Sequence, residues 1–84
     1  MNKHIVCCIH PFVVTQEIDV YQNGECIKTV KCALDQLEDT IVELGMKYNI
    51  NKIDLKGGQL YSLKIKENLE LNKYTENKFE VYIH

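Results

Sequence analysis

The segment Asn51-Lys52-Ile53-Asp54-Leu55-Lys56-Gly57-Gly58 decides the fold of this chain. Its apolar residues alternate with polar ones, as in a short β-strand, and an apolar pattern with a period of about 3.6 begins directly after the glycines. This change of period predicts a corner at which a strand passes into a helix. A strand that leads into a helix indicates an α/β fold with crossover connections.

A helix is predicted on each side of this strand. From Ala33 onward, apolar residues recur every three or four positions and form one stripe along a helix. The stripe consists of Leu34, Leu37, Ile41, Leu44 and Tyr48. Acidic residues in the first turns also favour a helix that starts here. Within this first helix, Gly45 is expected to cost about 1 kcal/mol relative to alanine. The second helix is predicted to run from the glycines to Leu71 or Asn72, and a half-exposed strand over 79–83 follows it.

Residues 4–21 form the first β region, which Pro11 interrupts. Because proline cannot donate to a ladder, it marks an edge, a bulge or a break between two strands. Before the proline both faces of the run are apolar, which predicts a central strand covered on each side. Beyond it, Phe12-Val13-Val14 is expected to resume the apolar run.

Asn23-Gly24 predicts a two-residue hairpin, because both residues tolerate the positive φ that a type I′ turn requires. The turn sets these cross-strand pairs: Gln22 with Glu25, Tyr21 with Cys26, Val20 with Ile27, and Asp19 with Lys28. The last pair joins opposite charges and is expected to contribute roughly 0.2–1 kcal/mol.

The predicted order is β-(β)-β-α-β-α-β, an α/β (α+β two-layer) fold: a mixed sheet of four to five strands with two helices packed on it. The 84 residues form a single domain, 1–84. A three-strand meander followed by α-β-α-β resembles, in element order and length, the ribonuclease H-like fold and half of an actin-like domain. The strand–glycine–helix half is also similar to small uncharacterised proteins of phages and mobile elements in low-GC bacteria, a resemblance that implies no activity.

The composition indicates a cytoplasmic protein that does not enter membranes. No apolar run approaches the roughly 20 residues that cross a bilayer, and no small-residue cleavage site follows the apolar N-terminal stretch, so we expect no signal peptide. All ten basic residues are lysine. Since arginine supplies the bidentate contacts to guanine and phosphate, nucleic acid is not the expected partner. Abundant Lys, Asn and Ile also indicate an AT-rich genome, which weakens that inference.

The four cysteines are predicted to be free and largely buried, because no CxxC spacing occurs and reduced cysteine behaves as a small hydrophobe. A metal site is the alternative for His4, Cys8 and His10, which share one strand parity. Cys8 and His10 are separated by about 6.6 Å of strand rise, which is loose for one tetrahedral ion. We therefore predict no metal and no cofactor.

The corner Asp54-Leu55-Lys56-Gly57-Gly58 is the candidate binding site. Free amide groups at the start of a helix bind anions, with Lys56, Gly57 and Gly58 as the expected ligands. Phosphate loops have longer glycine patterns, and here Gln59-Leu60-Tyr61 follows, so a purely structural corner is the favoured alternative.

The sequence predicts no catalytic residues. Ribonuclease H-like nucleases hold two metal ions with several carboxylates, one of them in the middle of the first strand. Here that strand has no acid, and Asp19, Glu38 and Asp54 lie on other elements. The first hypothesis is therefore a non-catalytic protein-interaction module, and the second is a minimal ribonuclease H-like enzyme or anion-binding protein that uses the glycine corner.

Tyrosines supply the candidate interface. Tyr21, Tyr74 and Tyr82 are expected to be exposed, and exposed tyrosine is common where proteins meet. The expected partner is another protein or a second copy of the chain, bound through this tyrosine-bearing face or through an edge strand.

Overall fold

The computed structural model describes residues 2–71 and 78–84. This part of the chain folds in the order β-β-β-α-β-α-β, which confirms the predicted order with five strands in the sheet. The elements are β1 (Lys3–Cys8), β2 (Thr15–Gln22), β3 (Glu25–Ala33), the 3₁₀ turn η1 (Leu34–Gln36), α1 (Leu37–Tyr48), β4 (Lys52–Lys56), α2 (Gln59–Glu70) and β5 (Glu80–Ile83).

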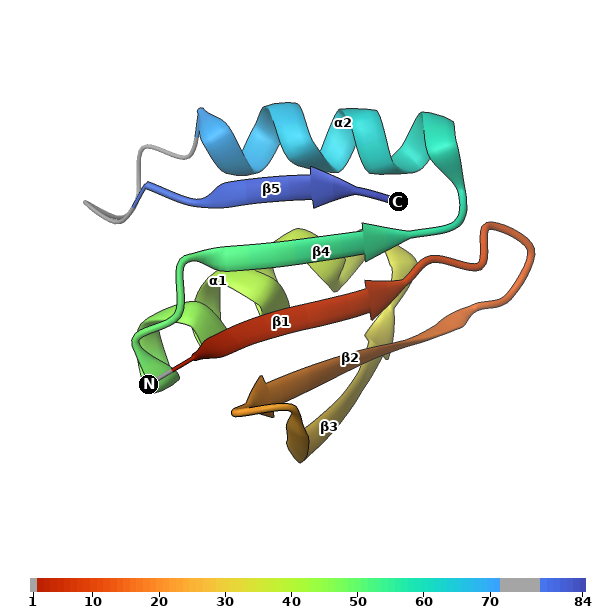
Figure 1. Ribbon diagram of the computed structural model, residues 1–84. Coiled ribbons are helices and arrows are strands. Elements are labelled where there is room, and N and C mark those ends of the chain that lie inside the picture. Colours follow the sequence, from red (N-terminus) through yellow and green to blue (C-terminus); the bar gives the residue numbers. More distant parts are fainter. Residues whose placement is uncertain (1, 72–77) are drawn as a thin grey trace.

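The sheet is mixed, and its strand order is β3-β2-β1-β4-β5 (Figure 1). The first three strands form an antiparallel meander, whereas β4 and β5 run parallel to β1. Short loops are sufficient to join antiparallel neighbours, but parallel neighbours need a crossover. The two helices supply these crossovers, so the change of hydrophobic period in the sequence coincides with the change from antiparallel to parallel strand pairing.

Both helices lie against one face of the sheet. Helix α1 packs on β2 and β3, α2 packs on β4 and β5, and together they enclose one core. The central strand β1 is therefore covered on one face only. On its other face, Val6 is half-buried and Cys8 is exposed. The expectation of cover on both faces was wrong, since an apolar strand run does not reveal how many helices pack on it.

Residues 9–14 form a loop, so Pro11 does separate two strands. The Ile9 amide donates to the Lys56 carbonyl oxygen at 2.7 Å, and this bond extends the pairing of β1 with β4 by one residue. The prediction that Phe12-Val13-Val14 resumes the apolar strand was wrong, because these side chains are 100%, 52% and 81% exposed. A proline that ends the ladder outweighs the strand propensity of the residues after it.

The hairpin turn and the pairs nearest to it form as predicted. A β-bulge next to Val20 then shifts the register, and the residue that it displaces, Ile27, is 44% exposed. Asp19 therefore faces Thr29, whose hydroxyl donates to Asp19 Oδ1 at 2.8 Å, and the predicted pair with Lys28 is wrong. Turn chemistry sets only the register beside the turn, and a bulge changes it further along.

The four thiols are free, but only Cys7 is buried. Burial, with smaller contributions from nearby acidic groups, raises the pKa of this thiol to about 12. Cys8 and Cys26 are exposed and Cys32 is half-buried, so the predicted burial holds for one thiol of the four. The difference follows from the open face of the sheet, which leaves alternate strand residues in water.

Gly45 lies where α1 meets the start of β5. A Cβ at this position would lie 2.8 Å from the Ile50 carbonyl oxygen and 2.8 Å from Cε1 of Phe79. The Gly45 carbonyl also accepts the Ile50 amide at 2.7 Å, which holds the chain after α1 close to the helix. Gly45 is a poor helix former, but because it has no side chain it lets Ile50 and Phe79 pack closely against α1.

We predict that Gly45→Ala destabilises the protein by about 1–3 kcal/mol, because a backbone oxygen and a buried ring would have to move. Helix propensity alone predicts the opposite sign, a gain of about 1 kcal/mol. Urea denaturation measures the difference in unfolding free energy. Met46→Ala, at a 56% exposed position of the same helix, is the control and should change little. A variant at Gly45 more stable than the parent chain would contradict the packing argument.

Candidate functional site

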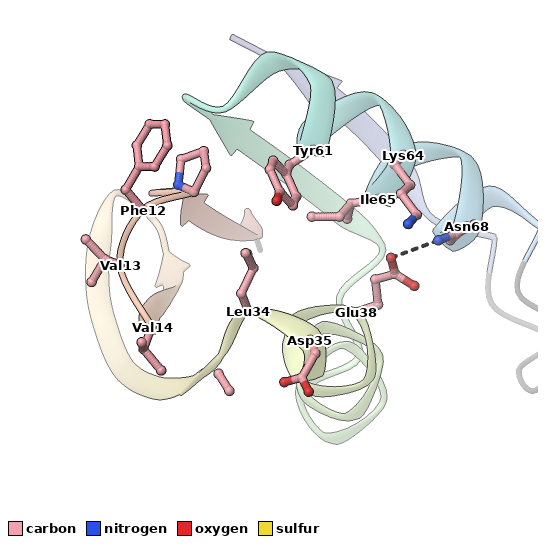
Figure 2. A pocket seen from close by; sticks show the side chains of 12 residues that line it. Phe12, Val13, Val14, Leu34, Asp35, Glu38, Tyr61, Lys64, Ile65 and Asn68 are labelled. Atoms are coloured by element: carbon pink, nitrogen blue, oxygen red, sulfur yellow. Dashed lines mark hydrogen bonds between the residues drawn. The ribbon is translucent and has the colours of Figure 1, made fainter.

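A groove opens in the helix layer at the carboxyl ends of β1, β3 and β4 (Figure 2). Its volume is about 840 Å³, and its walls are the loop after β1, the segment from Ala33 to the start of α1, and one face of α2 from Tyr61 to Asn68. Open α/β sheets place their ligands beyond the carboxyl ends of the strands. We call this site the Phe12 groove, after its apolar residues: Phe12, Val13, Val14, Leu34, Tyr61 and Ile65.

The groove exists because the two helices cover opposite halves of the sheet. They are joined across the gap by the Asn68 side-chain amide, which donates to Glu38 Oε1 at 2.9 Å (Figure 2). Leu34 from one wall and Ile65 from the other point into the space between the helices (Figure 2). The floor of the groove is therefore continuous with the core.

The buried side chain of Gln16 fixes the loop that forms the third wall. Its amide nitrogen donates to the carbonyl oxygens of His10 at 2.8 Å and Val13 at 2.6 Å, and its Oε1 accepts the His10 amide at 2.8 Å. The Val13 amide also donates to the His10 oxygen at 3.1 Å. The Gln16 side chain thus supplies the hydrogen-bond partners that the backbone groups of His10 and Val13 would have in a strand. Polar groups buried away from water need such partners.

Phe12 lies between the two residues that Gln16 holds, and its side chain is 100% exposed. Burying a phenylalanine side chain is worth roughly 1.5–3 kcal/mol, and this loop forgoes that gain. The neighbouring Val14 and Tyr61 are 81% and 44% exposed. An apolar patch of this kind beside a groove is typical of an interaction site.

The predicted anion ligands Lys56, Gly57 and Gly58 lie together at the corner between β4 and α2. The glycines have φ of 73° and 49°, and a Cβ on Gly57 would lie 2.9 Å from the Ile9 carbonyl oxygen. The buried Ser62 hydroxyl donates to the Gly57 oxygen at 2.8 Å. Positive φ and close packing therefore give both glycines a structural role, and anion binding stays a prediction.

The predicted interface tyrosines do not lie at the groove. Tyr21 and Tyr82 point to the open face of the sheet from β2 and β5, which are separated by two strands. The Tyr82 hydroxyl donates to a Glu80 carboxylate oxygen at 3.1 Å, and this bond raises the pKa of the tyrosine. Tyr74 lies outside the described residues.

Sequence reasoning did not identify a polar cluster on the open face. Asp54 lies between two imidazoles, with Oδ1 at 2.9 Å from Nε2 of His84 and Oδ2 at 4.0 Å from Nε2 of His4. The His4 ring stacks on Tyr21, with 5.3 Å between centroids. Strand periodicity in the sequence places His4 and Asp54 next to buried neighbours, but the pairing of β1, β4 and β5 that brings them together was not visible there.

The carboxylates considered for a nuclease do not converge. Asp19 and Asp54 lie on either side of Val6 on the open face, where a ribonuclease H-like site would need an acid, whereas Glu38 lines the groove on the opposite face. Within residues 2–71 and 78–84, no three His, Cys, Asp or Glu side chains come close enough to hold a metal ion.

Comparisons with protein-family models, with curated proteins and with solved structures find no match to this chain. Among the described residues, no helix combines the length and apolar character needed to cross a membrane.

We predict that Gln16→Met destabilises the protein by about 1–3 kcal/mol, because it leaves the loop's polar groups without their buried partner. The His10 amide, which loses its acceptor, should exchange its hydrogen faster than in the parent chain. Urea denaturation and amide hydrogen exchange measure the two effects. Glu17→Met is the control, since Glu17 makes only an exposed ion pair with Lys31 at 3.8 Å. Unchanged exchange at His10 would contradict the proposed role of Gln16.

Proposed function

We propose that the protein is a cytoplasmic, non-catalytic protein-interaction module that binds its partner through the Phe12 groove. One observation carries the proposal: a fully exposed Phe12 on a loop that a buried glutamine holds in place. Because the loop is already ordered, little conformational entropy would be lost when a partner binds. Aromatic side chains fixed in this way are typical binding hot spots.

The chemistry of the groove favours binding over catalysis. In the described part of the chain, the groove lining contains no cysteine, histidine or serine, and the charged groups there are Asp35, Glu38 and Lys64. The remaining lining is mostly apolar, as in the buried centre of protein interfaces. The partner is another protein or a second copy of the chain, and the homodimeric state and the phage or mobile-element origin remain predictions from the sequence.

We expect a photo-crosslinking residue in place of Phe12 to capture the partner in the native cell, and the same residue in place of Met46 to capture it far less. With the purified partner, Phe12→Ser should weaken binding about 30-fold or more, since a buried aromatic anchor is lost. Met46→Ser is the matched control. Because Phe12 is fully exposed, its replacement should leave the urea midpoint unchanged.

Light scattering of the purified chain reports whether the partner is a second copy. Equal affinity of the parent chain and Phe12→Ser for the captured protein would refute the assignment of this surface, as would equal capture from positions 12 and 46.

A second proposal, an anion-binding or minimal ribonuclease H-like protein, uses the glycine corner. It is supported by the left-handed Gly58 at the N-cap of α2, which makes no side-chain capping bond, and by the exposed Lys56 beside it. Uncapped amides at a helix start favour negative charge. The same corner borders the carboxyl-end position at which such sheets bind ligands.

This second proposal predicts a saturating shift of the Gly57 and Gly58 amide signals when inorganic phosphate is titrated in an NMR experiment. Lys56→Ala should weaken phosphate binding by up to about fivefold, since one exposed charge contributes up to about 1 kcal/mol. Lys52→Ala, at the other end of β4, is the control. Amide signals at 57 and 58 that do not respond to phosphate would remove this proposal.

A further inference from the structure

The walls of the Phe12 groove offer mainly side chains, and the single lining residue from a strand, Ala33, is the last residue of the edge strand β3. The groove otherwise lies in the helix layer between α1 and α2 and is lined by Leu34, Tyr61 and Ile65 among others. A partner segment lying in it therefore meets the end of one strand and has no ladder to join along its length. Recognition by addition of a strand, which needs an exposed sheet edge, does not apply to this site.

The lack of a ladder restricts the backbone that can bind there. An extended segment would place its N–H and C=O groups against apolar walls, and burying such a group without a hydrogen-bond partner is unfavourable. A helix satisfies its own backbone groups and presents side chains alone. The groove thus suits a helix that presents apolar residues at positions i, i+3 or i+4, and i+7.

The charges on the walls restrict the flanks of that helix. On one wall, Asp35 of η1 is exposed, and Glu38 of α1 is half-buried and accepts the Asn68 amide; the exposed Asp39 follows one residue later. The opposite wall carries Lys64. A bound helix that lies between the two walls therefore meets negative charge along one flank and the positive charge of Lys64 along the other. Charge complementarity selects a basic residue for the first flank.

We propose that the Phe12 groove binds an amphipathic helix of a partner protein, with its apolar face on Phe12, Leu34 and Tyr61 and a lysine or arginine toward Asp35 and Glu38. This inference rests on the proposed interaction function and adds the conformation and charge of the partner segment. The helix would lie beside α1 and α2 as a third member of the layer that covers the sheet.

Selection from two displayed peptide libraries tests the conformation. One library fixes a helix-forming frame and randomises one face, and the other fixes an alternating strand pattern with helix-breaking prolines at its ends. The folded full chain is the target. We expect enrichment from the helical library alone, with apolar residues at i, i+3 or i+4 and i+7 and with Lys or Arg on one flank.

Binding of the best helical peptide, measured by fluorescence anisotropy, then tests the groove and its charges. We expect Phe12→Ser to weaken binding about 30-fold or more, and Asp35→Lys to weaken it about three- to tenfold. Exchange of the peptide's basic residue for Glu should restore affinity for Asp35→Lys. Met46→Ser should bind like the parent chain.

The outcomes separate this inference from the function on which it rests. Enriched peptides that are extended or acidic, and that still lose affinity with Phe12→Ser, would overturn the helix while supporting the interaction site. Peptides whose affinity does not change with Phe12→Ser would overturn both the helix inference and the interaction site. Selections that enrich no sequence at all would do the same. A charge exchange without rescue would overturn the basic flank.

Discussion

The fold depends on the close contact between the end of β1 and the glycine corner that follows β4. The Ile9 amide donates to the Lys56 oxygen at 2.7 Å, and the position where a Cβ of Gly57 would stand is 2.9 Å from the Ile9 oxygen. This approach fixes both where α2 begins and where the loop after β1 leaves the sheet. The bonds of Gln16 then hold that loop, so one local contact and one buried side chain position the rim of the groove.

The two faces of the sheet have different roles. The covered face provides the core, and where the helices separate it provides an apolar groove that is continuous with that core. The open face is polar and places Asp54 against His84 and near His4. Its charged and aromatic groups are engaged with each other, as the stacking of His4 on Tyr21 shows. The most exposed large apolar side chain, Phe12, lies beside the groove together with Val14, although Leu60 and Leu63 are also exposed elsewhere on α2. The exposed aromatic ring next to a hollow favours the groove as the binding surface.

Much of the fold was predictable from the sequence, because the apolar period changes at each strand–helix boundary and glycine and proline mark the ends of elements. The site was less predictable. Phe12-Val13-Val14 has the composition of a strand, and its place in a loop depends on Gln16, a bonding partner that no periodicity reveals. The groove arises from the separation of two helices, a tertiary property. The β-bulge likewise depends on how the whole sheet twists rather than on the two turn residues.

The bulge in the hairpin also affects how this chain behaves at high concentration. The edge strand β3 is nine residues long, and an edge of that length invites chains to stack into fibrils. Here the irregular register bends the edge, and exposed Lys28 and Lys31 place positive charge along it. Polymerisation along this strand is thereby opposed, so the exposed aromatic ring of the loop after β1 is combined with an edge strand that is protected from pairing with other chains.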